Sequence, residues 1–520
     1  MPRERQAGLL VPLFSIASHE SWGVGEIPDI VRLAAWMRTA GFSFLQMLPV
    51  NEMAEGQNSP YSALSAMAID PIFIAPLAVP DVLALGGESI LDEAERTSLA
   101  AARRSGAVEY GMVRALKARV FRAAFDRFLA QERGRRTARA ARFDAFRDRE
   151  GWWLDEYALF RAIHARENRR HWLEWPAGLR DRDAAALARV REQLAGDILF
   201  YQYLQWLADE QWLEVRRAAR VGIFGDFPFM VSGDSADVWS RQQDFRMDAS
   251  VGAPPDAFSE TGQDWGFPAY RWREIAAGNY EWLANRARRS AELYDGFRVD
   301  HLVGFFRTYV REANGSAAFV PDDQAEQTAQ GERLLALFTA SGARVIAEDL
   351  GVIPDFVRQA LARANVPGYK VLRWEREWEE DGKPFRDPHA YPACAVATTG
   401  THDTETVAEW WDTAPIEERE ALVRLDSIRE AGCDARMPFG PQLRDALLSV
   451  LFASAADIVL LPIHDVFGWR DRINTPAVID ERNWTWRLPW PVDDLQTEPI
   501  ARERAAFLRA QAARAGRGQW

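Results

Sequence analysis

Acidic side chains follow several short apolar runs of this chain, often beside a histidine. Asp300, Glu348 and Asp403 each stand at the end of such a run, in the sequences FRVDH, IAEDL and GTHD. A carboxylate in that position is often only the N-cap of the next helix. Three carboxylates after three different runs are harder to explain by capping, and they predict a catalytic cluster.

Two of these carboxyl groups could cleave a glycosidic bond with retention of configuration. Arg298 lies two residues before Asp300, so on a strand both side chains share one face, and the guanidinium would keep the carboxylate ionised and nucleophilic. Glu348 would need a raised pKa in order to donate a proton. A nucleophilic carboxylate and a proton donor about 5–5.5 Å apart are typical of retaining glycosidases. Asp403 could stabilise an oxocarbenium-like transition state or bind sugar hydroxyls.

Sequence motifs for other chemistries are missing. The chain has no GxxxxGK[ST], no GxGxxG after a predicted strand, no HExxH and no GxSxG. Its seven histidines are too scattered for an obvious metal site, so we expect no metal and no cofactor. Lys370 could suggest a Schiff-base enzyme. We interpret it as a structural residue instead.

Eight short apolar runs are predicted to be the strands that carry these residues, and they alternate with helical patterns such as Asp29–Ala40 and Pro354–Ala364. Strands buried on both faces that alternate with helices predict an α/β fold, a (β/α)8 TIM barrel. In such a barrel, active residues lie at the C-terminal ends of the strands. The eight runs are Leu9–Leu13, Phe44–Pro49, Val221–Asp226, Phe297–Asp300, Val345–Glu348, Lys370–Trp374, Ala395–Thr399 and Ile458–Pro462.

The spacing between the runs is uneven. About 170 residues rich in Ala, Arg, Glu and Leu separate the second run from the third, too many for one connection, and they predict a helical insertion subdomain over 55–215. A stretch rich in Gly, Pro, Ser and Asp predicts a long irregular loop after strand three, with a substrate-cleft region over 227–285. About 58 residues follow the last run, too few for a C-terminal β-sandwich domain. We therefore expect a single catalytic barrel domain over 1–520.

Composition limits the class of partner and the compartment. The net charge of −13 argues against a nucleic-acid binder or an anionic-membrane binder. No stretch of 18 apolar residues predicts a membrane helix. The two cysteines, Cys394 and Cys433, cannot build a disulfide framework, so a reducing compartment, the cytoplasm, is expected. The apolar run near the N-terminus is interpreted as the first strand rather than a secretory signal.

The chain is also rich in tryptophan, with 21 such residues. Most are expected in the core. Trp265 lies between Gly262 and Gly266, which predicts a turn in which a large ring would lack core neighbours. Because the C–H-rich faces of sugars pack on aromatic rings, we expect Trp265 to face substrate.

Several motifs together resemble one enzyme family, the disproportionating 4-α-glucanotransferases (amylomaltases) of glycoside hydrolase family 77. The resemblance runs from about Gly8 to Trp486, and its most specific part is the segment Gly252–Gly266. The motifs are Ser59-Pro-Tyr-Ser62, Gly225-Asp-Phe-Pro-Phe229, Gly252-Ala-Pro-Pro-Asp256, Ser259-Glu-Thr-Gly-Gln-Asp-Trp-Gly266, Phe297-Arg-Val-Asp-His301, Ala347-Glu-Asp-Leu-Gly351, Thr399-Gly-Thr-His-Asp403 and Asn474-Thr-Pro476.

The resemblance implies a role for each matching residue. Asp300 would be the nucleophile that forms a covalent glucosyl-enzyme, Glu348 the general acid and then base, and Asp403 the transition-state stabiliser. Substrates would be maltooligosaccharides, amylose or other α-1,4-glucans, handled by a monomer or small homo-oligomer without metal or cofactor. The substrate-binding residues would be Ser59, Tyr61, Asp226, Asp256, Gln263, Trp265, Arg298, His301, His402 and Asn474.

Two other functions stay open at this point. An α-glucan hydrolase of the wider α-amylase clan would share the three carboxylates but pass the sugar to water. A non-catalytic glucan-binding protein would have no need of a proton donor, which argues against it.

Overall fold

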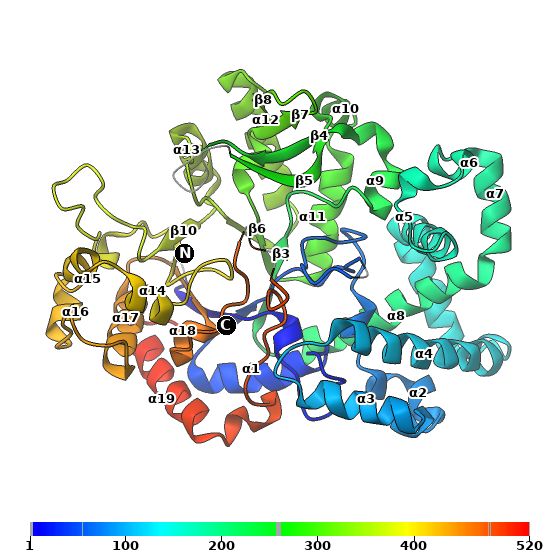
Figure 1. Ribbon diagram of the computed structural model, residues 1–520, viewed down its shortest axis with the longest axis horizontal. Helices are drawn as coiled ribbons and strands as arrows, with labels where there is room; N and C mark the ends of the chain where they lie inside the picture. The colour runs from blue at the N-terminus through cyan, green and yellow to red at the C-terminus, as the bar shows by residue number, and fades with distance from the viewer. Residues whose placement is uncertain (1–3, 55, 256–261, 477, 479, 519–520) are drawn as a thin grey trace.

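A closed barrel of eight parallel strands forms the centre of the molecule (Figure 1). The computed structural model describes residues 4–54, 56–255, 262–476, 478 and 480–518. Each of the eight predicted runs contains or overlaps one barrel strand, so the predicted (β/α)8 barrel is confirmed. In barrel order the strands are β1 (Gln6–Leu10), β12 (Ile458–Pro462), β11 (Ala395–Thr398), β10 (Gly368–Val371), β9 (Arg344–Ala347), β6 (Gly296–Val299), β3 (Gly222–Phe227) and β2 (Phe44–Gln46).

Amphipathic helices cover the barrel. Helix α1 buries Ile30, Leu33, Ala34 and Met37, the spacing of one helical face, and ends at Gly41 with a φ of +81°. Its bounds are those that the sequence predicts. The helices outside the β2–β3 connection, apart from one short helix after β3, are α1 (Asp29–Ala40), α10 (Trp272–Ala277), α11 (Glu281–Leu293), α12 (Gln324–Thr339), α13 (Asp355–Ala364), α14 (Val407–Thr413), α15 (Ile416–Leu422), α16 (Asp426–Glu430), α17 (Pro441–Ala453), α18 (Ile463–Phe467) and α19 (Pro499–Arg514).

The chain between β2 and β3 folds into helices that gather on one side of the barrel, at the right of Figure 1. Buried aromatic rings hold this group together; the ring centroid of Phe128, for example, lies 5.0 Å from that of Tyr203 and 5.5 Å from that of Trp206. These helices are α2 (Pro80–Ala84), α3 (Glu93–Arg104), α4 (Tyr110–Phe128), α5 (Ala138–Arg166), α6 (Ala177–Arg180), α7 (Ala184–Gln193) and α8 (Ala195–Ala218).

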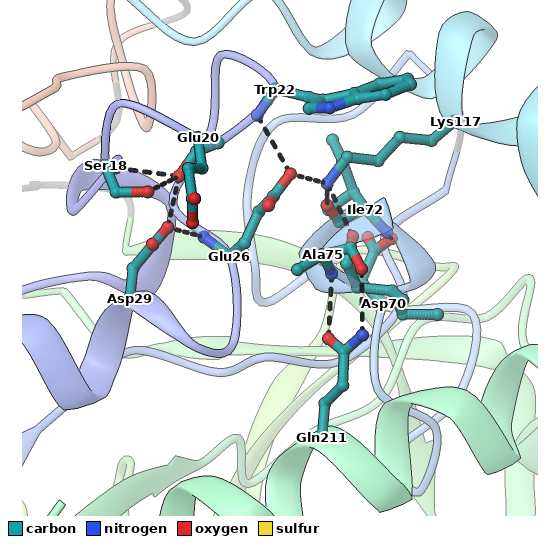
Figure 2. Close-up of polar contacts among 12 residues, drawn as sticks. Ser18, Glu20, Trp22, Glu26, Asp29, Asp70, Ile72, Ala75, Lys117 and Gln211 are labelled. Carbon is teal, nitrogen blue, oxygen red and sulfur yellow. Dashed lines mark hydrogen bonds and ion pairs between the residues drawn. The ribbon is translucent and has the colours of Figure 1, made fainter. Parts of the chain in front are cut away.

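A buried polar cluster ties these helices to the barrel. Figure 2 shows Lys117 reaching from α4 to Glu26, which lies just before α1; the Lys117 Nζ is 2.7 Å from Glu26 Oε1 and donates to the carbonyl of Ile72. Gln211 of α8 bonds both backbone groups of Ala75. Burial raises the pKa of Glu26 to about 7, although the Lys117 ammonium opposes this shift.

The prediction of an irregular loop after strand three is wrong. Helix α9 (Ala236–Ser240) follows β3, and then an antiparallel sheet forms in the order β5–β4–β7–β8. Two register shifts in the β4–β5 pairing interrupt the alternation that would reveal strands in the sequence. Trp265, expected in a turn, therefore lies within a strand. The four strands are β4 (Phe245–Ala253), β5 (Gln263–Tyr270), β7 (Thr308–Glu312) and β8 (Ala317–Val320).

After β12, the described residues carry no sheet. None of the described helices has both the length and the apolar character needed to cross a bilayer.

Candidate active site

The C-terminal ends of the barrel strands bring the predicted carboxylates to one rim. Asp226 lies in β3 and pairs in register with Arg298 of β6. Asp300 follows β6 directly, and Glu348 follows β9, the next strand of the barrel. Because all eight strands run in parallel, residues distant in the sequence meet at this end of the barrel.

Arg298 joins two carboxylates from neighbouring strands. Its Nη1 donates to both oxygens of Asp226 at 2.9 and 2.8 Å, and its Nη2 lies 2.7 Å from Asp300 Oδ1. Burial alone would lower the pKa of Arg298, whose side chain is 5% exposed, but the charges of Asp226 and Asp300 hold that pKa well above its usual value. The guanidinium thus fixes the Asp300 carboxylate, which is 31% exposed, at the rim.

Glu348 comes directly after the neighbouring strand β9, within the electrostatic influence of Arg298. Its Oε2 accepts a hydrogen bond from the backbone N–H of His301 and its Oε1 accepts one from Leu350, both at 2.9 Å. Burial raises the pKa of Glu348 to about 7 and the charge of Asp300 adds to this shift, whereas Arg298 and the two backbone bonds oppose it. A carboxyl group with such a pKa can donate a proton near neutral pH.

Asp403 lies in a different environment and stays ionised. Asn474 Nδ2 donates to its Oδ1 at 2.6 Å, and His402 Nε2 lies 3.2 Å from its Oδ2. Burial would raise the pKa of Asp403, but the charge and hydrogen bond of His402, together with Asn474, lower it to about 2. The rim therefore holds one carboxyl group that retains its proton near neutral pH and one that does not.

Tyr61 connects Asp226 on one part of the rim to His402, the neighbour of Asp403, on another. Its hydroxyl donates to Asp226 Oδ2 at 2.8 Å and lies 2.9 Å from His402 Nε2. Its ring stacks on that of His402, with centroids 5.6 Å apart and planes 20° from parallel. The hydroxyl of Ser59 accepts a bond from the backbone N–H of Tyr61 and so stabilises the turn that presents this ring.

Two residues of β5 approach the site from the antiparallel sheet. The indole of Trp265 meets His301 edge to face, with centroids 4.7 Å apart, and its Nε1 donates to Gln263 Oε1 at 3.1 Å. Burial lowers the pKa of His301 to about 4, so this imidazole is neutral at pH 7. Asp256, also predicted from the sequence, lies outside the described residues.

One neighbour of the site was not predicted. The ring of Trp484 contacts both Tyr61 and His402, with centroid distances of 5.8 Å to each. The sequence offers one signal for it: Trp484 stands only ten residues after Asn474, a predicted site residue, in a stretch that also carries Trp486.

The described residues contain no group of three or more His, Cys, Asp or Glu side chains suited to a metal ion. Lys370 lies 3.3 Å from Glu375 in a structural ion pair. Acid–base and nucleophilic chemistry by carboxyl groups is favoured by the contrast between Glu348 and Asp403 beside the Arg298-bound Asp300.

Known proteins resemble this chain along nearly its whole length. A family model described as 4-alpha-glucanotransferase matches residues 11–493. The 4-alpha-glucanotransferase of Chlamydia pneumoniae is 31% identical over 510 residues, covering 94% of this chain and 92% of the relative. That of Thermus thermophilus is 33% identical, covering 98% and 99%. The solved amylomaltase of Streptococcus agalactiae in complex with acarbose has a TM-score of 0.83 at 25% identity and covers 99% of this chain and 100% of that one.

Proposed function

The chain belongs to the 4-alpha-glucanotransferases of glycoside hydrolase family 77 and is an enzyme of that class, and on this premise we propose how its residues transfer a glucan. The substrates are maltooligosaccharides, amylose or other α-1,4-glucans. The observation that carries the proposal is Arg298, a single buried guanidinium that bonds Asp300 while its charge acts on Glu348. The same buried arginine therefore positions the proposed nucleophile, Asp300, and influences the charge state of the proposed proton donor, Glu348.

In the first step Asp300 attacks the anomeric carbon while Glu348 protonates the departing glycosidic oxygen. The raised pKa of Glu348 supplies that proton near neutral pH. The C–O bond to the leaving sugar breaks and a covalent glucosyl-enzyme forms on Asp300. Asp403, ionised and held by Asn474, stabilises the positive charge that develops on the sugar ring.

In the second step Glu348, now ionised, takes the proton from the 4-OH of an acceptor sugar. That oxygen attacks the intermediate, releases Asp300 and restores the original configuration. An oriented acceptor can outcompete water because effective molarities of well-oriented intramolecular reactions reach about 10⁵ M or more. The reacting glucose would be held by Tyr61, Asp226, Arg298, His301 and His402. Ser59 stabilises the turn at Tyr61 by accepting a hydrogen bond from its backbone N–H.

Maltotriose distinguishes transfer from the alternatives. Transfer yields glucose and longer maltodextrins with an unchanged number of reducing ends, whereas hydrolysis increases that number. Asp300→Asn should abolish turnover of maltotriose while leaving its binding measurable by calorimetry. Asp322→Asn, at an exposed carboxylate, serves as the control. Unchanged turnover in Asp300→Asn would contradict the mechanism, and a wild-type enzyme that only increases reducing ends would support the hydrolase.

Trp265 is proposed to line the acceptor side and to exclude water. Its ring packs against His301 and is half-buried. Trp265→Ala should therefore raise the ratio of hydrolysis to transfer, measured as new reducing ends per glucose released from maltotriose. Trp152→Ala removes an exposed tryptophan on α5, in the helices between β2 and β3, and should leave the ratio unchanged. An unchanged ratio in Trp265→Ala would exclude this role.

A further inference from the structure

A short segment of the tail adds two side chains to the catalytic rim. Asn474 bonds Asp403, and ten residues later Trp484 packs on Tyr61 and His402. Trp484 is buried, with 9% of its surface exposed. In Figure 1 this orange part of the chain runs toward the centre of the view, near the labels of β3 and β6.

The backbone of Trp484 is in an unusual conformation. Its φ of +66° lies in the left-handed region, which a bulky side chain rarely adopts and glycine adopts freely. Hydrogen bonds hold it there from two sides. The N–H of Trp484 donates to the carbonyl of Ile473, and the hydroxyl of Tyr110, the first residue of α4, donates to the carbonyl of Trp484, both at 2.8 Å.

The indole completes a cluster of three rings. It lies 58° from the plane of Tyr61 and 45° from that of His402, while those two rings stack on one another. The polar atoms of the cluster reach the carboxylates: the Tyr61 hydroxyl bonds Asp226, and His402 Nε2 approaches Asp403. A tilt of either ring would alter one of these contacts.

We propose that Trp484 is a positioning residue for glucan transfer, whose indole fixes the orientation of Tyr61 and His402 and, through His402, of Asp403. A role in packing alone does not explain the conformation, since strained residues persist where surrounding structure holds them and cluster at active sites. Through the Tyr110 hydrogen bond, α4, one of the helices between β2 and β3, also helps to hold Trp484 in place beside the site. The inference rests on the proposed roles of Asp403, His402 and Tyr61.

The test compares Trp484→Gly, which removes ring and strain together, with Trp484→Leu and Trp484→Phe. The measurements are kcat and KM for maltotriose per folded molecule, the pH profile of kcat, and the melting temperature. Gly and Leu should lower kcat at least tenfold with a smaller change in KM, since a misplaced group about 1 Å away from its position can cost up to about 100-fold. Phe should recover most of kcat because it keeps an aromatic ring.

The pH profile separates positioning from packing. If His402 loses its orientation, its contact with Asp403 weakens, so the acid limb of kcat should move to higher pH in Trp484→Gly and Trp484→Leu. Trp486→Leu is the matched control, because the Trp486 ring packs on His464 instead, with centroids 4.0 Å apart. This control should lower the melting temperature but leave kcat and the pH profile unchanged.

Two results would overturn the inference: wild-type kcat and acid limb in Trp484→Gly, or, if the Gly variant does not fold, equal kcat in Trp484→Leu and Trp484→Phe. A wild-type enzyme that fails to transfer glucose units would instead contradict the proposed function.

Discussion

Replacing the proposed proton donor by Glu348→Gln should abolish transfer and, above neutral pH, make the enzyme more stable. The folded protein raises the pKa of Glu348 from an ordinary value of 4.5 to about 7, mainly through burial. Between these two values the folded state binds more protons than the unfolded state, so wild-type stability falls as pH rises through this window. Glutamine has no charge to bury and avoids this loss.

The size of the effect follows from the pKa. At pH 8, ionising a carboxyl whose pKa has risen from 4.5 to about 7 costs the folded state about 3 kcal/mol. The variant also loses something, because Gln has one acceptor oxygen where Glu348 accepts from both His301 and Leu350. One unpaired backbone N–H costs about 1 kcal/mol. The net gain in the free energy of unfolding is therefore about 2 kcal/mol at pH 8. Below about pH 4.5 the ionisation term disappears, and the unpaired N–H leaves the variant about 1 kcal/mol less stable than wild type.

Urea denaturation followed by tryptophan fluorescence at pH 5, 6, 7 and 8 measures this difference. Glu379→Gln, at an exposed glutamate, is the control and should show no pH-dependent gain. A Glu348→Gln variant whose stability relative to wild type is the same at pH 8 as at pH 5 would refute the argument that burial of this carboxyl group opposes its ionisation.

Two further predictions concern Asn474, which bonds Asp403 in the site, and Lys117, which joins the helices between β2 and β3 to Glu26. Asn474→Ala removes a hydrogen bond that helps to lower the pKa of Asp403 to about 2. The acid limb of the pH profile of kcat should therefore move to higher pH. An acid limb that stays in place would contradict this role of Asn474. Lys117→Met leaves Glu26 buried without its ammonium partner and should lower the free energy of unfolding by about 3 kcal/mol at pH 8. The loss should shrink at pH 5, where Glu26 binds a proton, and equal losses in urea denaturation at both pH values would argue against the ion pair.

Much of the fold follows from local sequence patterns. Strands buried on both faces read as short apolar runs, and Ile458–Pro462 was predicted with the bounds of β12. The antiparallel sheet after β3 was missed because register shifts break the alternation of β4 and β5. Glycines such as Gly252 predict a loop there, yet Gly252 lies inside β4, where a Cβ would come within 1.9 Å of the Gln263 carbonyl oxygen.

The sequence by itself determined which residue types stand at the ends of which strands, and so the class of chemistry. The spacing of two residues predicts that Arg298 and Asp300 share a face, and their side chains do lie 2.7 Å apart although Asp300 comes just after β6. Only the tertiary structure decided that Arg298 also bonds Asp226, 72 positions away, and that Tyr61 meets His402 across 341 positions. It likewise decided that Glu348 retains its proton while Asp403 does not. Closure of the barrel sets these distances and the burial of each carboxyl group, and neither is encoded in a local pattern.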